Sequence, residues 1–193
     1  MESCSIAIIG ATGAVGVKFI ELLDSRKFPS TSVRVCASAR SYGNKILVCG
    51  EELTIEEPTA KLFSEVDIVF ISANGDVSRD LAPKAVQNGA LVIDDSSAFR
   101  MNDNVPLVVP EVNVEDLESH AGIISIPNCS TTPLVMVLKA LNDVNPVRRV
   151  VVDTFQSVSG TGKAAVNELR RQSEQVLNDE NIELSEYPHQ IAF

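Results

Sequence analysis

The sequence of 193 residues has no tryptophan, two histidines and four cysteines. The cysteines include no C-x-x-C pair, so the ligand spacing typical of zinc sites is missing, and we expect no bound metal. Unpaired cysteines of this kind are typical of a reduced, cytoplasmic protein in which most of them are small hydrophobic residues. The four are Cys4, Cys36, Cys49 and Cys129.

Long apolar runs and basic segments are also missing. No stretch reaches the length of a transmembrane helix, and the N-terminal MESCSIAIIG lacks the basic region and apolar length of a signal peptide. The 16 Lys and Arg are outnumbered by 26 Asp and Glu, which gives a net charge of −10. This balance disfavours a nucleic-acid or anionic-membrane surface, although a local anion site needs only one Arg and a few backbone N–H groups.

Patterns of strand and helix alternate along the first half of the chain. The alternation implies parallel βαβ units, and therefore a doubly wound (Rossmann-type) parallel α/β sheet with its ligand beyond the carboxyl ends of the strands. A hairpin is expected around Gly50. The expected strands are 5–10, 33–37, 67–72 and 90–96, and the expected helices are 14–25 and 76–88, the second interrupted by Pro83.

The glycine-rich segment GATGAVG lies at the first strand-to-helix turn. Missing side chains let the backbone turn tightly and approach a pyrophosphate, which the helix N-terminus attracts. The alternative is a glycine-rich turn without a ligand. The residues expected to bind the cofactor here are Gly10, Thr12, Gly13, Ala14, Val15 and Gly16.

The end of the second strand indicates which nucleotide is bound. A fold that prefers NAD usually carries an acid there, which bonds the ribose 2′-OH. This strand ends in ASARS, which offers Ser38, Arg40 and Ser41 and no acid. Because Arg and Ser can bind a 2′-phosphate, the sequence predicts NADP as the cofactor. The alternative is that Arg40 is an ordinary solvated residue.

Cys129 stands between a Pro-Asn turn and an apolar helical pattern. The residues Leu134, Val137, Leu138 and Leu141 form one helical face, so Cys129 lies at or just before a helix N-terminus. Unpaired N–H groups and the helix dipole favour a thiolate there. In this setting the sequence predicts a nucleophile, whereas the other three cysteines lie in or beside apolar strand patterns.

The motifs resemble, in their order, those of aspartate-β-semialdehyde dehydrogenases. They are GATGAVG, ASARS, DDSSAFR, PLVVPEVN, PNCSTTP and QSVSGTGKAAVNEL. The resemblance covers nearly the whole chain and implies NADP-dependent phosphorylating dehydrogenation of aspartate semialdehyde, run in biosynthesis as reduction of β-aspartyl phosphate. It implies that Cys129 is the nucleophile and that Gln156 orients the acyl group. It also implies that Arg100, Asn128 and Ser97 bind phosphate, and that the full-length protein is a homodimer.

The resemblance also implies a domain division and a longer natural chain. Residues 1–128 would form the NADP-binding domain, and 129–193 would begin the catalytic and dimerisation domain. The family places its acid/base histidine in a second half that is not present here. His120 and His189 do not match that position, so we expect the 193-residue chain to lack turnover.

Two alternatives are also compatible with these residues. One is a related acyl-phosphate reductase, such as N-acetyl-γ-glutamyl-phosphate reductase, or a glyceraldehyde-3-phosphate-type dehydrogenase. Around the cysteine the first of these families resembles the motif P-G-C-Y and the second the motif S-C-T-T-N, whereas this chain has P-N-C-S-T. The other alternative is a non-catalytic NADP-binding or dimerisation module.

Overall fold

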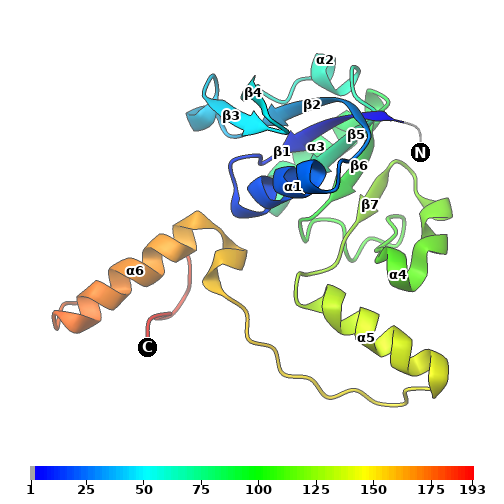
Figure 1. Ribbon diagram of the computed structural model, residues 1–193. Helices are drawn as coiled ribbons and strands as arrows, with labels where there is room; N and C mark the ends of the chain where they lie inside the picture. Colours follow the sequence, from blue (N-terminus) through cyan, green and yellow to red (C-terminus); the bar gives the residue numbers. More distant parts are fainter. Residues whose placement is uncertain (1–2) are drawn as a thin grey trace. The chain divides into compact units, whose positions relative to one another are not determined.

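The computed structural model describes residues 3–193 (Figure 1). Met1 and Glu2 lie outside the described residues. They belong to the N-terminal stretch that, as stated above, lacks the features of a signal peptide. The chain divides into two compact units, Met1–Val150 and Val151–Phe193. The predicted boundary between residues 128 and 129 concerns the family's domains and stays a prediction.

A five-stranded parallel sheet in the order β2-β1-β5-β6-β7 forms the centre of the first unit. The chain passes from β1 to one neighbour, β2, and later returns to the other neighbour, β5, so the strand order reverses between β1 and β5. This arrangement confirms the predicted doubly wound α/β fold. The strands are β1 (Cys4–Ile9), β2 (Ser30–Cys36), β5 (Ile68–Ile71), β6 (Leu91–Asp94) and β7 (Ile123–Ser125).

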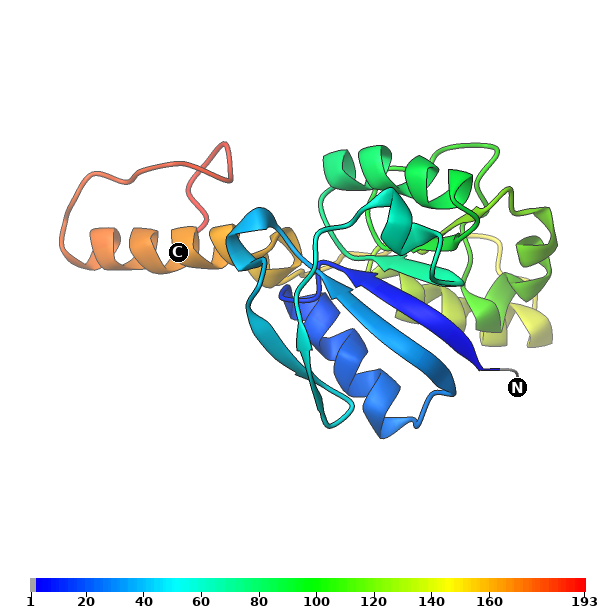
Figure 2. The same cartoon turned by 90° about the horizontal axis from the view of Figure 1, so that it is seen from above.

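Helices cover both faces of this sheet (Figure 2). Helix α1 (Ala14–Ser25) buries Ile20 and Leu23 in the cluster that contains Ile8, and its Phe19 ring stacks on Phe70 with centroids 4.0 Å apart. On the opposite face, α2 (Ala60–Phe63) and α3 (Gly75–Gln87) pack on the strands. The two apolar layers hold the sheet edge that carries the candidate site.

Helix α3 runs unbroken through Pro83, so the predicted interruption was wrong. Proline removes one backbone hydrogen bond and crowds the preceding turn, which costs about 3 kcal/mol in an isolated helix. Ala82 and Ala85 on either side of it are fully buried against the sheet. This packing keeps both halves of the helix in place.

The predicted hairpin is formed by β3 (Lys45–Val48) and β4 (Glu51–Thr54), which pair antiparallel. Its two turn residues, Cys49 and Gly50, both have positive φ, as a two-residue turn of this kind requires. The remaining elements of the unit are η1 (Ala39–Ser41), α4 (Pro110–Asn113), η2 (Val114–Ser119) and α5 (Thr131–Val144).

The second unit consists of η3 (Val158–Thr161), α6 (Lys163–Leu177) and a segment that returns along α6. The Glu168 carboxylate, buried on α6, accepts bonds from the backbone N–H groups of Ser185 and Glu186 at 2.8 and 2.7 Å. Residues 187–193 form no strand, and the N–H of Ile191 bonds the Gln172 side chain on α6. No helix in the described part of the chain has the length and apolar character needed to cross a membrane.

Candidate functional site

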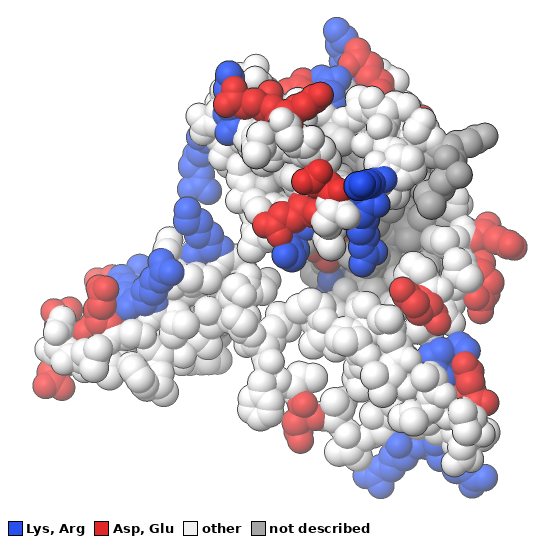
Figure 3. Space-filling view, in the orientation of Figure 1, with Lys and Arg blue, Asp and Glu red and all other residues white. Residues whose placement is uncertain are grey.

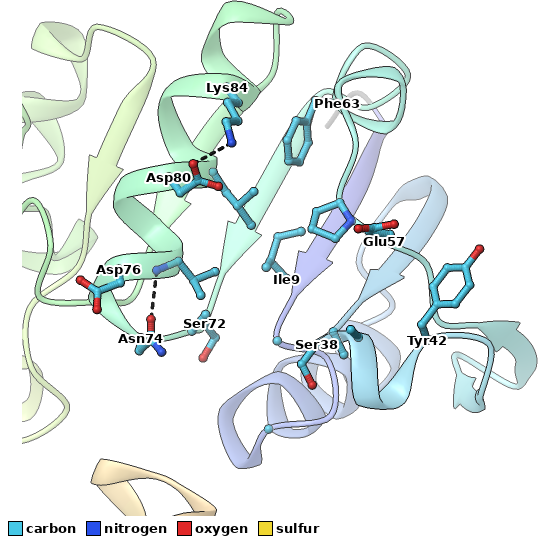
Figure 4. A pocket seen from close by; sticks show the side chains of 18 of the residues that line it. Ile9, Ser38, Tyr42, Glu57, Phe63, Ser72, Asn74, Asp76, Asp80 and Lys84 are labelled. Atoms are coloured by element: carbon cyan, nitrogen blue, oxygen red, sulfur yellow. Dashed lines mark hydrogen bonds and ion pairs between the residues drawn. The ribbon is translucent and has the colours of Figure 1, made fainter.

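A pocket of about 1180 Å³ opens at the carboxyl ends of β1 and β5, where the strand order reverses (Figure 4). Four of the predicted cofactor residues line it, namely Gly10, Thr12, Gly13 and Ser38. Its floor is apolar and includes Ile9 and Phe63. This is the position at which doubly wound folds bind their ligands.

Two glycines of the first turn are required by close backbone packing. Gly10 has a φ of 87°, and a side chain there would overlap the carbonyl oxygen of Ser72 on the neighbouring strand loop. A side chain at Gly16 would overlap the Gly10 carbonyl oxygen. Gly16 is buried and does not line the pocket, so its role in the structure is to let α1 approach the turn.

The N-terminus of α1 is open to an anion. Its N-cap, Gly13, provides no side-chain cap, and no acidic residue lies in the first turn. The Gly13 N–H closes the turn by donating to Gly10 O at 2.9 Å. The positive end of the 12-residue helix α1 therefore has no side chain competing with a bound phosphate.

Of the three residues expected to select NADP, one lines this pocket. Ser38 lines it, whereas Arg40 and Ser41 belong to η1 and are not among the lining residues. Arg40 is exposed and follows Ser38 and Ala39, both of which do line the pocket. The predicted residues Ala14 and Val15 also lie outside the lining.

The pocket contains residues that the sequence patterns missed. Tyr42 and Glu57 lie on the same side as Ser38. Glu57 is brought there by a nonlocal contact, because its neighbour Glu56 accepts a bond from Arg34 Nε at 2.6 Å and bridges to Cys36 at the end of β2. No local sequence pattern predicts that contact.

Asn74 and Asp76 line the pocket from the opposite side (Figure 4). The Asn74 side chain caps α3 by accepting a bond from the Val77 N–H at 3.0 Å. The cap was readable from the sequence, since an Asn follows a buried strand and precedes a helical pattern. Asp80, further along α3, forms an ion pair with Lys84 at 2.6 Å.

Cys129 lies where the sequence predicted, one residue before the N-cap of the 14-residue helix α5. Its side chain is exposed. Asn128 shapes this turn, because its carbonyl oxygen accepts bonds from the N–H groups of Thr131 and Thr132 at 2.8 and 3.2 Å. The Asn128 Oδ1 atom accepts a further bond from the Ser130 N–H at 3.0 Å.

These bonds change the expectation that several helix amides remain open beside the cysteine. Asn128 occupies the N–H groups of Ser130, Thr131 and Thr132, and Pro133 has none. The N–H of Cys129 itself has no partner within residues 3–193. It is therefore the amide at this terminus that is left to face a ligand.

Arg100 links two loops at the carboxyl edge of β6 and β7. Its Nη2 donates to Asp95 O at 2.8 Å and its Nε donates to Ile126 O at 2.9 Å. Arg100 is half-buried, and Nη1 has no partner in the described part of the chain. The guanidinium is thus bonded to Ile126, which lies three residues before Cys129 in the chain. Its Nη1 atom keeps N–H donors for an anion.

Asp95 is bonded both to Ser72, which lines the pocket, and to Arg100. Burial raises the pKa of its carboxyl above the ordinary value, while a 3.3 Å bond from Ser72 Oγ and the charge of Arg100 oppose that shift. Ser97, the other predicted phosphate residue of this loop, is exposed. Gln156 belongs to the second unit, where it lies beside Gly160.

Two of the other cysteines, Cys36 and Cys49, are less suited to act as nucleophiles. Burial raises the pKa of Cys36 to about 12. Burial, Asp24 and Glu51 together raise the pKa of the Cys49 thiol above its ordinary value. Thiols with raised pKa values carry little thiolate near neutral pH, so they react slowly.

Charged side chains of both signs are interspersed on the face in view in Figure 3. Among residues 3–193, no three His, Cys, Asp or Glu side chains lie close enough together to hold a metal ion. The features that stand out are the pocket at the carboxyl ends of β1 and β5 and the exposed Cys129 on the same edge of the sheet.

Comparisons with known proteins agree with this geometry. Residues 5–120 match the family model "Semialdehyde dehydrogenase, NAD binding domain", and residues 138–193 match "Semialdehyde dehydrogenase, dimerisation domain". The chain belongs to the semialdehyde dehydrogenase family. The resemblance to aspartate-semialdehyde dehydrogenases stated from the motifs is thereby confirmed, as is the presence of a dinucleotide-binding domain.

The relatives include aspartate-semialdehyde dehydrogenase of Bacillus subtilis (strain 168), which is 46% identical over 97% of this chain and 56% of that protein. A crystal structure of aspartate semialdehyde dehydrogenase II from Vibrio cholerae, complexed with ASA, is 39% identical. It has a TM-score of 0.91 and covers 100% of this chain and 58% of that one.

A third relative is the aspartate semialdehyde dehydrogenase from Candida albicans, crystallised with NADP. It is 31% identical with a TM-score of 0.65, over 75% of this chain and 48% of that one. This chain therefore spans about half the length of the relatives it matches.

Proposed function

We propose that the whole protein is an NADP-dependent, phosphorylating aspartate-semialdehyde dehydrogenase, and that this chain supplies its cofactor domain and its nucleophile. In the biosynthetic direction it reduces β-aspartyl phosphate to aspartate semialdehyde. This step leads to threonine, to methionine and, through diaminopimelate, to lysine. The observation that carries the proposal is the exposed Cys129 directly before α5, with Arg100 fixed to the backbone that leads to it.

Cys129 is the nucleophile in this proposal. Its thiolate attacks the acyl carbon of β-aspartyl phosphate, the carbon–oxygen bond to phosphate breaks, and a thioester forms. The N–H of Cys129 is placed to donate to the oxyanion that develops on the acyl oxygen. Gln156 orients the acyl group.

Arg100, Asn128 and Ser97 bind the phosphate. The free Nη1 of Arg100 supplies charge-assisted donors. Asn128 has its Oδ1 engaged by Ser130, so its amide nitrogen is the group that faces an anion. The Ser97 hydroxyl is exposed and adds a further donor.

The pocket at the end of β1 fits NADP. It is roomy, has an apolar floor, and opens on the uncapped N-terminus of α1, whose glycines leave no side chain in the way of a pyrophosphate. A bound NADPH supplies the hydride that reduces the thioester. Arg40, with Ser38 and Ser41, binds the 2′-phosphate at the rim.

Proton transfer to the substrate oxygen requires a base that this chain does not provide. His120 is exposed and follows η2, and its Nδ1 accepts a bond from the Gly122 N–H at 3.1 Å. His189 lies in the irregular segment of the second unit. We propose that the base lies in the part of the full-length protein that corresponds to the rest of its relatives.

A homodimer is part of the proposal. Its support is the family's dimerisation domain, which matches residues 138–193, and the exposed apolar side chains of α5 such as Val137 and Leu141. A cytoplasmic location fits the four cysteines, all of which are free.

Trapping the acylated cysteine tests the proposal. A form of the protein that spans the full length of its relatives is mixed with aspartate semialdehyde and NADP in the absence of phosphate, and its peptides are mapped by mass spectrometry. We expect an aspartyl thioester on Cys129 and none in Cys129→Ser. Acylation of Cys36 or Cys49, or NADPH formation without any acylated cysteine, would contradict the assignment.

A further inference from the structure

A buried polar pair, Asp94 and Ser96, underlies the loop that carries Ser97 and Arg100. Asp94 is the last residue of β6 and is fully buried. One of its carboxylate oxygens accepts a bond from the Ser78 hydroxyl on α3, and the other accepts a bond from Ser96 Oγ at 2.9 Å. Serine hydroxyls therefore satisfy both oxygens of a buried carboxylate.

Ser96 passes this restraint on to the loop backbone. Its Oγ donates to Asp94 and accepts a bond from the Ala98 N–H at 3.0 Å, which closes the turn over the exposed Ser97. Ser96 itself is only 6% exposed. The turn is therefore fixed from below, by groups that do not face solvent.

The other end of the loop is fixed by Arg100. The guanidinium bonds Asp95 O in its own loop and Ile126 O in the loop before Cys129. The segment from 96 to 100 thus has one anchor in the buried carboxylate and another beside the cysteine. A loop anchored at both ends holds its anion donors in place before the anion arrives, which reduces the entropy lost on binding.

We propose that Asp94 and Ser96 are positioning residues for phosphate binding. Asp94 orients the Ser96 hydroxyl, and Ser96 fixes the turn that presents Ser97 and Arg100. Neither residue touches the phosphate. The inference rests on the proposed function, since it takes the anion held by this loop to be the phosphate of that reaction.

Ser78 offers a matched control. It is also fully buried and bonds the same carboxylate, but it lies on α3 and makes no bond to the loop from 96 to 100. Ser78→Ala and Ser96→Ala each remove one buried hydroxyl from Asp94. Only Ser96→Ala also leaves the Ala98 N–H without its acceptor.

The experiment compares these variants in the full-length protein, with the KM for inorganic phosphate and kcat measured separately in the oxidative direction. For Ser96→Ala we expect the KM for phosphate to rise roughly three- to tenfold, the scale of one lost hydrogen bond, with kcat little changed. We expect Ser78→Ala to lower thermal stability to a similar extent and to leave the KM for phosphate unchanged. Ser96→Thr, which retains a hydroxyl, should restore a low KM.

Arg100→Ala separates the failure of this inference from failure of the proposed function. If Arg100→Ala raises the KM for phosphate and Ser96→Ala does not, the positioning role is overturned while the phosphate site stands. An equal rise in Ser78→Ala would also overturn it, because the effect would then be a general loss of support. If Arg100→Ala has no effect on phosphate, the proposed site itself fails. Should Ser96→Ala not fold, we expect the nearly isosteric Ser96→Cys to raise the KM for phosphate as well, by a smaller factor.

Discussion

Arg40 is the residue on which the choice between NADP and NAD depends in this account. It is exposed and lies two residues after Ser38, which lines the pocket. We expect Arg40→Ala to lose roughly 1.5–3 kcal/mol of NADP binding, the value of one charge-assisted hydrogen bond, and to leave NAD binding nearly unchanged. Titration calorimetry with both nucleotides measures this difference.

Arg26→Ala provides the control for net charge, because Arg26 caps the far end of α1 and does not line the pocket. It should leave both affinities unchanged. Equal NADP affinity in Arg40→Ala and the unaltered chain would remove Arg40 from its role. The selectivity would then have to come from another residue on the same side of the pocket, such as Tyr42.

At the scale of single residues, the sequence located those whose environment is local. Gly10, Gly13 and Cys129 follow or precede recognisable strand and helix patterns, and the structure places them at the corresponding turns. Glu57 was missed because a contact between distant segments, Arg34 with Glu56, brings it to the pocket. The amides near Cys129 were misjudged because the bonds made by Asn128 are not encoded in periodicity.

At the scale of elements, α6 and the segment returning along it depend on one buried carboxylate. Glu168 would have a raised pKa from burial alone, but bonds from the N–H groups of Ser185, Glu186 and Tyr187 lower its pKa below the ordinary value. A carboxyl with a lowered folded-state pKa stabilises the structure above its unfolded pKa of about 4.3. That stabilisation is lost as the pH falls through the folded-state pKa.

We therefore expect the segment from 183 to 187 to detach from α6 as the pH falls from the unfolded pKa of about 4.3 through the lower folded-state pKa of Glu168. The backbone amide resonances of Ser185 and Glu186, followed by NMR, report this change. Glu168→Gln should show the detached resonances already at neutral pH. Glu174→Gln, which changes an exposed carboxyl on the same helix, should behave like the unaltered chain. Resonances independent of pH and of Glu168 would refute the role of this carboxylate.

Element types were predictable wherever periodicity was strong, as in α1 and α5. The path of α3 through Pro83 was not, because buried contacts at Ala82 and Ala85 outweigh a local helix-breaking preference. The irregular end of the chain was not predictable for a related reason. Its apolar alternation reads as a strand, but the Gln172 and Glu168 side chains supply the bonds that a neighbouring strand would otherwise provide.

This chain is about half as long as its relatives. We therefore expect the 193-residue chain and the full-length protein to differ in activity. A positioned acid or base typically contributes on the order of 10² to 10⁴ in rate. We expect the 193-residue chain to bind NADP and to form NADPH from aspartate semialdehyde at least about 100-fold more slowly than the full-length protein. Equal rates would mean that His120 or His189 acts as the base.

Phosphate-dependent NADPH formation by the full-length protein and by its Cys129→Ser variant shows whether Cys129 is the nucleophile of a phosphorylating dehydrogenase. Aspartate semialdehyde and NADP are held at saturating concentrations, and inorganic phosphate is varied from zero. We expect turnover to rise with phosphate to a plateau in the unaltered protein and to be absent in Cys129→Ser at every phosphate concentration. Turnover by Cys129→Ser at the unaltered rate, or a rate independent of phosphate, would contradict it.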